Sequence, residues 1–235
     1  MSQDNSLVAV LRGRRSVAQP RLAGSVIDDH TVVREALESA RWAPNHKLTE
    51  PWRFYLLDDR RIEHLAELNA ELLERGGSNA DKVAAKREQW AAVPGVVIIT
   101  VRSAADADAV MRREDYAAVA CAAQNFMLHL WSAGVASKWS TSAVWRHEEF
   151  WPLLGHGAWN HETAARVVTP NADAANGGAA NGRATNDGAN NGVATNEGTA
   201  PQEEVVGIFF YGIAAGVPAA RRRLALPEVL HDFRA

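Results

Sequence analysis

The clearest helical pattern near the N-terminus runs from Asp28 to Trp42. Its apolar positions recur at intervals of three and four and fall on one helical face: Val32, Val33, Ala36, Leu37 and Ala40. Asp28 and Asp29 can cap its first turn, and the ring of Pro44 cannot continue a helix. We therefore expect an amphipathic helix that ends at Pro44.

A longer helical pattern covers Arg112 to Ser132 and should break at Gly134. Its apolar positions keep helical spacing for several turns: Tyr116, Val119, Ala120, Ala123, Phe126, Met127 and Leu130. Little polar surface remains on any side, which is typical of a helix buried on several faces. Such a helix belongs at the centre of a domain or between two subunits.

Three segments have the composition of strands. They are "WRFYLL" at Trp52 to Leu57, "GVVIITV" at Gly95 to Val101, and a late run "EEVVGIFFYGI" that leads into a glycine-rich exit at Ala214 to Gly216. Two further helical stretches, Ile62 to Glu74 and Asp81 to Trp90, separate the first strand from the second. This order of helices and strands predicts an α+β domain.

One segment departs from this pattern. Residues Asn176 to Ala200 form five quasi-repeats with a period of five residues: "NGGAA", "NGRAT", "NDGAN", "NGVAT" and "NEGTA". A pentapeptide solenoid needs a large apolar residue at the centre of each unit, and here that place is taken by Gly, Arg or Val. We expect a flexible Asn/Gly/Ala-rich insertion at residues 171–201 within one continuous domain of residues 1–235, because long loops cost little to close.

Composition narrows the class of protein. With 235 residues, 47% of them hydrophobic and 23% charged, the chain has the balance of an ordinary soluble globular protein. A formal net charge of -3 provides no basic field, so nucleic acid is not an expected partner. Cys121 is the single cysteine, and no apolar run follows the N-terminal residues, so we expect neither secretion nor a membrane span. The expected location is the cytoplasm.

Three polar segments could carry chemistry, and the first lies after a short apolar helix at Leu7 to Leu11. Arg14, Arg15 and Ser16 place two guanidinium groups and a hydroxyl within three residues. A phosphate accepts bidentate hydrogen bonds from arginine, so the segment suits a phosphate. A solvated basic helix end is the alternative interpretation.

The second segment, "APNHKLTEPWRF", places Asn45, His46 and Lys47 between Pro44 and Pro51, directly before a strand. The prolines constrain the loop and the three residues offer hydrogen-bond donors. By itself the pattern is also that of a plain loop with a turn.

The third segment, "GVASKWSTSAVW", predicts a strand that delivers Trp139, Ser140, Thr141 and Ser142 at its end. Hydroxyl and backbone N–H groups there could bind a ligand, although serine and threonine are also common in ordinary turns. No catalytic triad or metal site is evident. His147 lacks the second histidine of a zincin helix, and we expect His156 and His161 in a surface turn.

Taken in order, these segments resemble the FMN-dependent nitroreductase family, and most closely its small single-domain members. The resemblance rests on "RRS", the "AP-x-H-K-x-x-x-PWRF" loop, "AAQNFMLHLWSAG", the Trp-Ser-Thr turn and "VVGIFFYG". It implies an α+β fold in which a mixed β-sheet is flanked by helices. It also implies an intertwined homodimer with two FMN molecules at the interface.

Carried over by position, the resemblance implies a role for each polar segment. Arg14, Arg15 and Ser16 would hold the FMN phosphate and ribityl chain. Trp42 and His46 would reach the flavin from the other subunit. The residues expected against the ring system are Trp139, Ser140 and Thr141.

Two positions differ from close family members or stay open. Ser140 and Ser142 stand where some close members have Arg and Gly, so contacts to substrate or nicotinamide can differ. The Arg221 to Arg223 cluster stands where some relatives have a basic residue near the phosphate, but a surface patch is equally consistent.

The resemblance implies an oxidoreductase that transfers hydride from NAD(P)H through bound FMN to nitroaromatic, quinone or similar small acceptors. Because the flavin carries the hydride, no side-chain nucleophile and no metal are needed. The alternatives are a flavin-modifying or dehalogenating relative and a non-catalytic FMN-binding module. The sequence does not distinguish NADH from NADPH or identify the acceptor.

Overall fold

The computed structural model describes residues 6–19, 22–23, 31–156, 202–220 and 222–231. Four predictions lie outside these ranges: the 171–201 insertion, the capping of a helix by Asp28 and Asp29, the place of His161 and that of Arg221.

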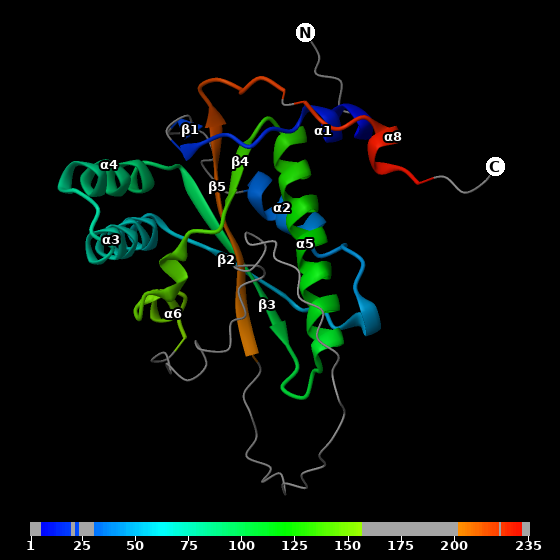
Figure 1. Cartoon of the computed structure of the whole chain (residues 1–235), viewed down its shortest axis with the longest axis horizontal. Helices are drawn as coiled ribbons and strands as arrows, with labels where there is room; N and C mark the ends of the chain where they lie inside the picture. Colours follow the sequence, from blue (N-terminus) through cyan, green and yellow to red (C-terminus); the bar gives the residue numbers. More distant parts are fainter. Residues whose placement is uncertain (1–5, 20–21, 24–30, 157–201, 221, 232–235) are drawn as a thin grey trace, which may run out of the picture.

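A five-stranded sheet forms the centre of the described structure. Its strands are β1 (Leu22–Ala23), β2 (Trp52–Leu56), β3 (Gly95–Ser103), β4 (Ala136–Ser140) and β5 (Gln202–Ala214). The order is β1-β5-β3-β2, and β4 also pairs with β5. Figure 1 shows β3 and β5 side by side in the middle of the molecule, in agreement with their pairing.

All of these strand pairs are antiparallel. The expectation of a mixed sheet is therefore wrong for the described strands. Among the described residues, parallel pairing occurs at an isolated bridge between Ser16 and Ser137. It joins the segment after the first helix to β4, and it is too short to form a strand.

Helices cover both faces of the sheet, and this explains why four successive residues of β3, Val96 to Ile99, are all apolar and buried. Successive side chains of a strand point to opposite faces. Val97 and Ile99 pack in the cluster that includes the apolar residues of α2 (Thr31–Ala40) and α5 (Ala109–Ser132). Val96 and Ile98 pack in the second cluster, with α3 (Asp59–Arg75) and α6 (Phe150–Leu153). In Figure 1, α3 and α5 accordingly lie on opposite sides of the sheet.

The helices occupy the expected segments with small changes at their ends. Asp58 accepts a hydrogen bond from the third residue after it and starts α3, and Asn79 does the same for α4 (Ala80–Ala91). Asp108 caps α5, which begins three residues before the predicted start and ends at the predicted residue. Two short helices lie near the chain ends, α1 (Leu7–Gly13) and α8 (Leu226–Val229).

We expected α5 to be buried on several faces. In the single chain, part of its surface is buried and part is exposed. Eight of its residues are buried, and they include Val119, Phe126 and Leu130. Cys121 and Gln124 are exposed on the single chain. None of the described helices is long and apolar enough to cross a membrane.

Candidate functional site

The segment after α1 connects two of the three predicted polar segments. Ser6 caps α1, and the helix ends at Gly13. The chain then runs extended beside β4, where the Val17 N–H donates to the Ser137 carbonyl at 3.0 Å and Ser16 bridges to Ser137. The Arg14 to Ser16 segment is thereby fixed to the strand that ends at Ser140.

Arg14 lies in a cluster of positive charge. Burial lowers the pKa of its guanidinium, and the nearby charges of Arg15 and Arg223 lower it further. Its Nη1 donates to Ser16 Oγ at 3.5 Å, and no ion pair joins it to a carboxylate in the described parts of the chain. Cations that crowd together at partial burial favour binding of an anion, because an anion offsets their repulsion and desolvation.

Arg223 comes to this cluster from the segment after β5. The sequence left open whether the Arg221 to Arg223 cluster lies near the phosphate or forms a surface patch. In the structure, the charge of Arg223 is close enough to Arg14 to lower the pKa of its guanidinium. Arg15 has a different role in the single chain. Its Nη1 donates to the carbonyls of Arg12, Gly13 and Arg14 at 2.6, 3.0 and 2.9 Å, so it closes the C-terminus of α1.

The turn after β4 is fixed by neighbours on both sides. Trp139 Nε1 donates to the Val206 carbonyl at 3.0 Å, and its ring lies 5.1 Å from the ring of Phe209. Ser142 Oγ donates to Asn69 Oδ1 of α3 at 3.1 Å and accepts from Val144 N–H at the start of a 3-10 helix, η3 (Ala143–Arg146). Between these anchors, Ser140 is partly exposed and Thr141 is exposed.

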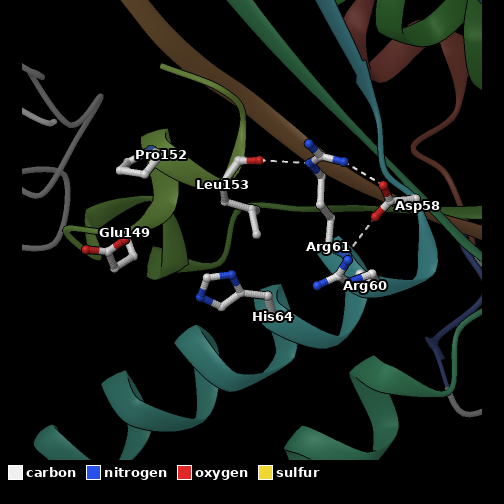
Figure 2. Close-up of a pocket in the computed structure, with 7 residues that line it drawn as sticks. All are labelled: Asp58, Arg60, Arg61, His64, Glu149, Pro152 and Leu153. Atoms are coloured by element: carbon white, nitrogen blue, oxygen red, sulfur yellow. Dashed lines mark hydrogen bonds and ion pairs between the residues drawn. The ribbon is translucent and has the colours of Figure 1, made fainter. Parts of the chain in front are cut away.

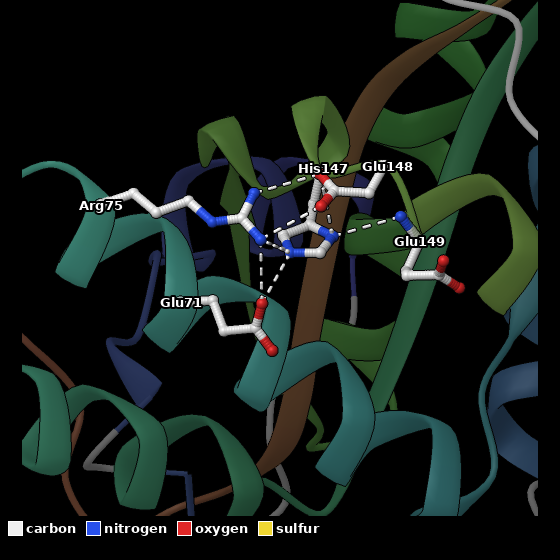
Figure 3. Close-up of polar contacts among 5 residues, drawn as sticks. All are labelled: Glu71, Arg75, His147, Glu148 and Glu149. Carbon is white, nitrogen blue, oxygen red and sulfur yellow. Dashed lines mark hydrogen bonds and ion pairs between the residues drawn. The ribbon is translucent and has the colours of Figure 1, made fainter.

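A polar network beyond the turn ties the same region to α3 (Figure 3). Buried His147 lies with Nε2 3.0 Å from Glu71 Oε2, while its Nδ1 accepts the Glu149 N–H at 3.2 Å. Arg75 Nη2 also lies 3.3 Å from His147 Nε2, so both members of the Glu71 and Arg75 pair contact the ring. Arg75 donates to both carboxylate oxygens of Glu148 at 3.1 Å and lowers the pKa of that carboxyl to about 2.

Sequence reasoning had considered His147 only as an incomplete zinc ligand. The structure shows it as a packing residue that holds the chain after η3 against α3. The signal that could have pointed to it is the Glu71 and Arg75 pair, which has the i,i+4 spacing of a helical ion pair.

The loop of the second polar segment contains strained backbone. Lys47 and Leu48 both have φ of 54°, and Glu50 has φ of 43°. Non-glycine residues seldom adopt positive φ, and such residues cluster where function requires a particular backbone. His46 is exposed at the start of a 3-10 turn, η2 (His46–Leu48).

Trp42 projects from the end of α2 and is 73% exposed. Its Nε1 donates to Glu38 at 3.2 Å, and the guanidinium of Arg41 lies 5.4 Å from the centre of its ring. Within the described part of one chain, no hydrogen bond, ion pair or ring contact joins Trp42 or His46 to Arg14 or Trp139. Within the described residues of one chain, these predicted site residues therefore make no direct contact with each other.

Trp42 also borders a groove of about 530 Å³ between α1, α2 and α5. The groove is lined by Leu7, Val10, Ser39, Trp42, Asn125, Leu128, His129 and Ser132. In it, Ser39 Oγ lies 2.8 Å from His129 Nδ1. The groove is thus mostly apolar, with polar groups on α2 and α5.

A second cavity, of about 430 Å³, lies between the start of α3 and α6. In Figure 2, Arg61 reaches from α3 toward the Leu153 carbonyl, to which its Nε donates at 3.2 Å, and it pairs with Asp58. Its guanidinium is therefore engaged by protein groups. The lining contains none of the predicted site residues.

His156 follows the turn at Gly155, as expected, but it is only partly exposed. Its Nε2 lies 2.8 Å from the Tyr55 hydroxyl, and its ring lies 5.2 Å from that of Trp151. The described residues contain no group of three or more metal-ligating side chains.

Comparisons with known proteins bear on the family and the fold. The model of the Nitroreductase family matches residues 11–143, which include Arg14 to Ser16, the loop of Asn45 to Lys47, and Trp139 to Ser142. The Bacillus subtilis (strain 168) protein "Putative NAD(P)H nitroreductase YfhC" is 26% identical over 176 residues, 74% of this chain and 88% of that protein.

Two solved structures share the fold. A nitroreductase-like family protein from Bacillus cereus is 20% identical and superimposes with a TM-score of 0.66, covering 100% of both chains. The NADPH:FMN oxidoreductase of Vibrio harveyi, solved with NAD+, is 10% identical with a TM-score of 0.59, covering 97% of this chain and 77% of that one. Because the family match extends over more than half of the chain, the protein belongs to the nitroreductase family.

Proposed function

We propose that the protein is an FMN-dependent oxidoreductase that uses NAD(P)H to reduce nitroaromatic, quinone or similar small acceptors. The observation that carries the proposal is the connection between a cationic cluster and an ordered aromatic turn. The cluster at Arg14 and the turn at Trp139 lie on segments joined through Ser16 and Ser137. FMN has the matching form, with a dianionic phosphate at one end and a flat ring system at the other.

The residues present fit the phosphate of FMN. Arg14 and Arg223 supply positive charge, and Ser16 Oγ lies beside the Arg14 guanidinium at 3.5 Å. Charged hydrogen bonds of this kind each contribute about 1.5–3 kcal/mol. Arg15 adds charge to the cluster, while one of its nitrogens stays bound to the carbonyls at the end of α1.

The turn after β4 fits the ring system. The hydrogen bonds from Trp139 to Val206 and from Ser142 to Asn69 fix both ends of the turn, so Ser140 and Thr141 are held in place before any ligand binds. Bound FMN would accept two electrons from NAD(P)H and pass them to the acceptor. The protein itself would bind, orient and polarise the flavin.

The exposed apolar surface supports a homodimer. Leu7 and Leu11 on α1, Trp42 at the groove, and Leu226 and Leu230 near the C-terminus are each at least 49% exposed in the single chain. Of these residues, Leu7 and Trp42 line the same groove. Large exposed apolar side chains that lie together are typical of a protein interface. In the dimer, Trp42 and His46 would complete the flavin site of the partner subunit.

The decisive experiment is anaerobic reduction of the purified protein by NADH and by NADPH, followed by reoxidation with quinones and nitroaromatics. Bleaching of a yellow protein by either nicotinamide supports an enzyme, whereas a yellow protein that neither bleaches indicates a binding module. Because nicotinamide and acceptor would share one pocket in turn, steady-state rates should give parallel double-reciprocal lines. Intersecting lines would mean that both substrates bind together.

A further inference from the structure

The loop from Asn45 to Glu50 has three non-glycine residues with positive φ. This conformation must be stabilised by contacts with residues outside the loop. Inside the loop, Asn45 Oδ1 accepts the Glu50 N–H at 3.0 Å, and the Thr49 N–H donates to the His46 carbonyl at 3.3 Å. These bonds shape the loop, but they do not attach it to the rest of the protein. Strained backbone persists where surrounding structure determines it.

Arg53 of β2 donates to the Glu50 carbonyl at the end of the loop at 3.2 Å. Two consecutive acidic residues of α5 contact the interior of the loop. Thr49 Oγ1 donates to Asp115 Oδ1 at 2.8 Å. One residue earlier in α5, Glu114 Oε2 lies 3.8 Å from His46 Nδ1. Both contacts lead from the first half of α5 to the same short loop.

Asp115 is an unusual residue for its position. It is 3% exposed, and it belongs to the buried face of α5 with Ala118 and Val119. A carboxylate at such a position is costly unless it accepts hydrogen bonds. Its contact with Thr49 joins residues 66 positions apart, so it fixes the loop to the central helix rather than stabilising α5 locally.

We propose that Asp115 is a positioning residue that acts through Thr49 to hold the 45–50 loop in the one conformation that binds flavin. The contact keeps the loop in its positive-φ form, and the Glu114 carboxylate lies 3.8 Å from His46 Nδ1 on the same loop. This inference rests on the proposed function, because the fixed conformation of the loop would serve to contact the flavin ring of the partner subunit. Asp115 itself touches no substrate or cofactor.

The test compares FMN with riboflavin, which lacks the phosphate. Thr49→Val removes the hydroxyl at nearly constant shape, and Thr49→Ser keeps it. Dissociation constants are measured by flavin fluorescence titration of protein freed of flavin, with melting temperature and dimer mass as controls. We expect Thr49→Val to weaken both flavins by the same factor, about tenfold, and Thr49→Ser to restore wild-type binding.

Asp115→Leu and the double variant complete a cycle. If Asp115 acts through Thr49, the double variant binds flavin no more weakly than the weaker of the two single variants. Arg14→Ala, by contrast, should weaken FMN but leave riboflavin unchanged.

Several outcomes would overturn the inference while leaving the proposed function intact. Thr49→Val could bind both flavins as the wild type does, or it could lose affinity for FMN but not for riboflavin. The effects of the two single variants on flavin binding could be additive in the double variant. Thr49→Ser could also fail to restore the affinity that Thr49→Val loses. A wild-type protein that binds neither flavin would refute the proposed function, and this inference with it.

Discussion

The indole of Trp139 occupies the space that a side chain on Gly207 would need. A Cβ added to Gly207 would come within 2.1 Å of Trp139 Nε1 and 2.5 Å of its Cδ1. The pairing register between β3 and β5 shifts at this level, so that Ile99 faces Gly207 while Thr100 faces Val205. Such bulges re-aim neighbouring side chains. Here Val206 is the residue that the pairing skips, and its carbonyl accepts the hydrogen bond from the indole N–H.

The first prediction concerns this pair. Gly207→Ala should displace the indole and lower the free energy of unfolding by about 1–3 kcal/mol, the usual cost of overpacking. Urea denaturation measures the loss, and Trp fluorescence and the flavin absorption band report the displacement. Gly216→Ala is the matched control, because a Cβ there meets nothing within 4 Å. Unchanged stability and spectra for Gly207→Ala would show that the indole is free to move.

The second prediction separates the phosphate end from the ring end. Arg14→Ala should weaken FMN binding by about 1.5–3 kcal/mol, and Ser16→Ala by less, because the serine hydroxyl carries no charge of its own. Arg223→Ala should resemble Arg14→Ala, because both charges belong to one cluster. Titration with FMN and riboflavin measures the effect. If the variants weaken the binding of both flavins equally, the cluster does not bind the phosphate.

The third prediction concerns pH. The pKa of Glu148 is lowered from 4.5 to about 2, chiefly by its hydrogen bond with Arg75. A carboxyl whose folded pKa is depressed stabilises the fold above its unfolded pKa and loses that contribution as pH falls toward the folded value. Glu148→Gln should therefore lower the melting temperature at pH 6, with the difference from wild type closing between pH 4.5 and pH 2. A difference independent of pH would exclude the ion pair as its cause.

The fourth prediction links flavin content to association. If Trp42 and His46 complete the site of a partner chain, dilution should release flavin together with dissociation of the dimer. Analytical ultracentrifugation with detection at protein and flavin wavelengths follows both events in one experiment. A monomer that keeps stoichiometric FMN would contradict a site shared between subunits.

The fifth prediction concerns residues 171–201. Their Asn/Gly/Ala-rich sequence has almost no large apolar side chains to contribute to a core, so a short Gly/Ser linker should replace them. Flavin content, dimer mass and melting temperature should stay nearly unchanged. Loss of the dimer in this variant would give the segment a structural role.

Local pattern alone identified most of the secondary structure. The period of apolar residues in α5 and the unbroken apolar run of β3 predicted both elements to within three residues at each end. The same sequence contained the polar segments at Arg14, His46 and Trp139. These features could be predicted because each depends on residues close together in the chain.

Contacts between distant residues could not be predicted in the same way. The sequence did not indicate that the described sheet is antiparallel, since strand direction depends on how β5 lies between β3 and β4. Nor did it distinguish His147 as a buried partner of Glu71, because a histidine in an acidic run has the same local pattern whether exposed or packed.

The sequence by itself therefore determined most of the helices and strands, but not β1, α6 or α8, and it determined which short stretches carry polar chemistry. Only the tertiary structure decided that Arg223 joins Arg14, that Ser142 binds Asn69, and that Asp115 holds Thr49. The last two contacts join residues 73 and 66 positions apart. Periodicity describes the faces of one element, whereas these partners meet only after α3, α5 and the sheet have packed together.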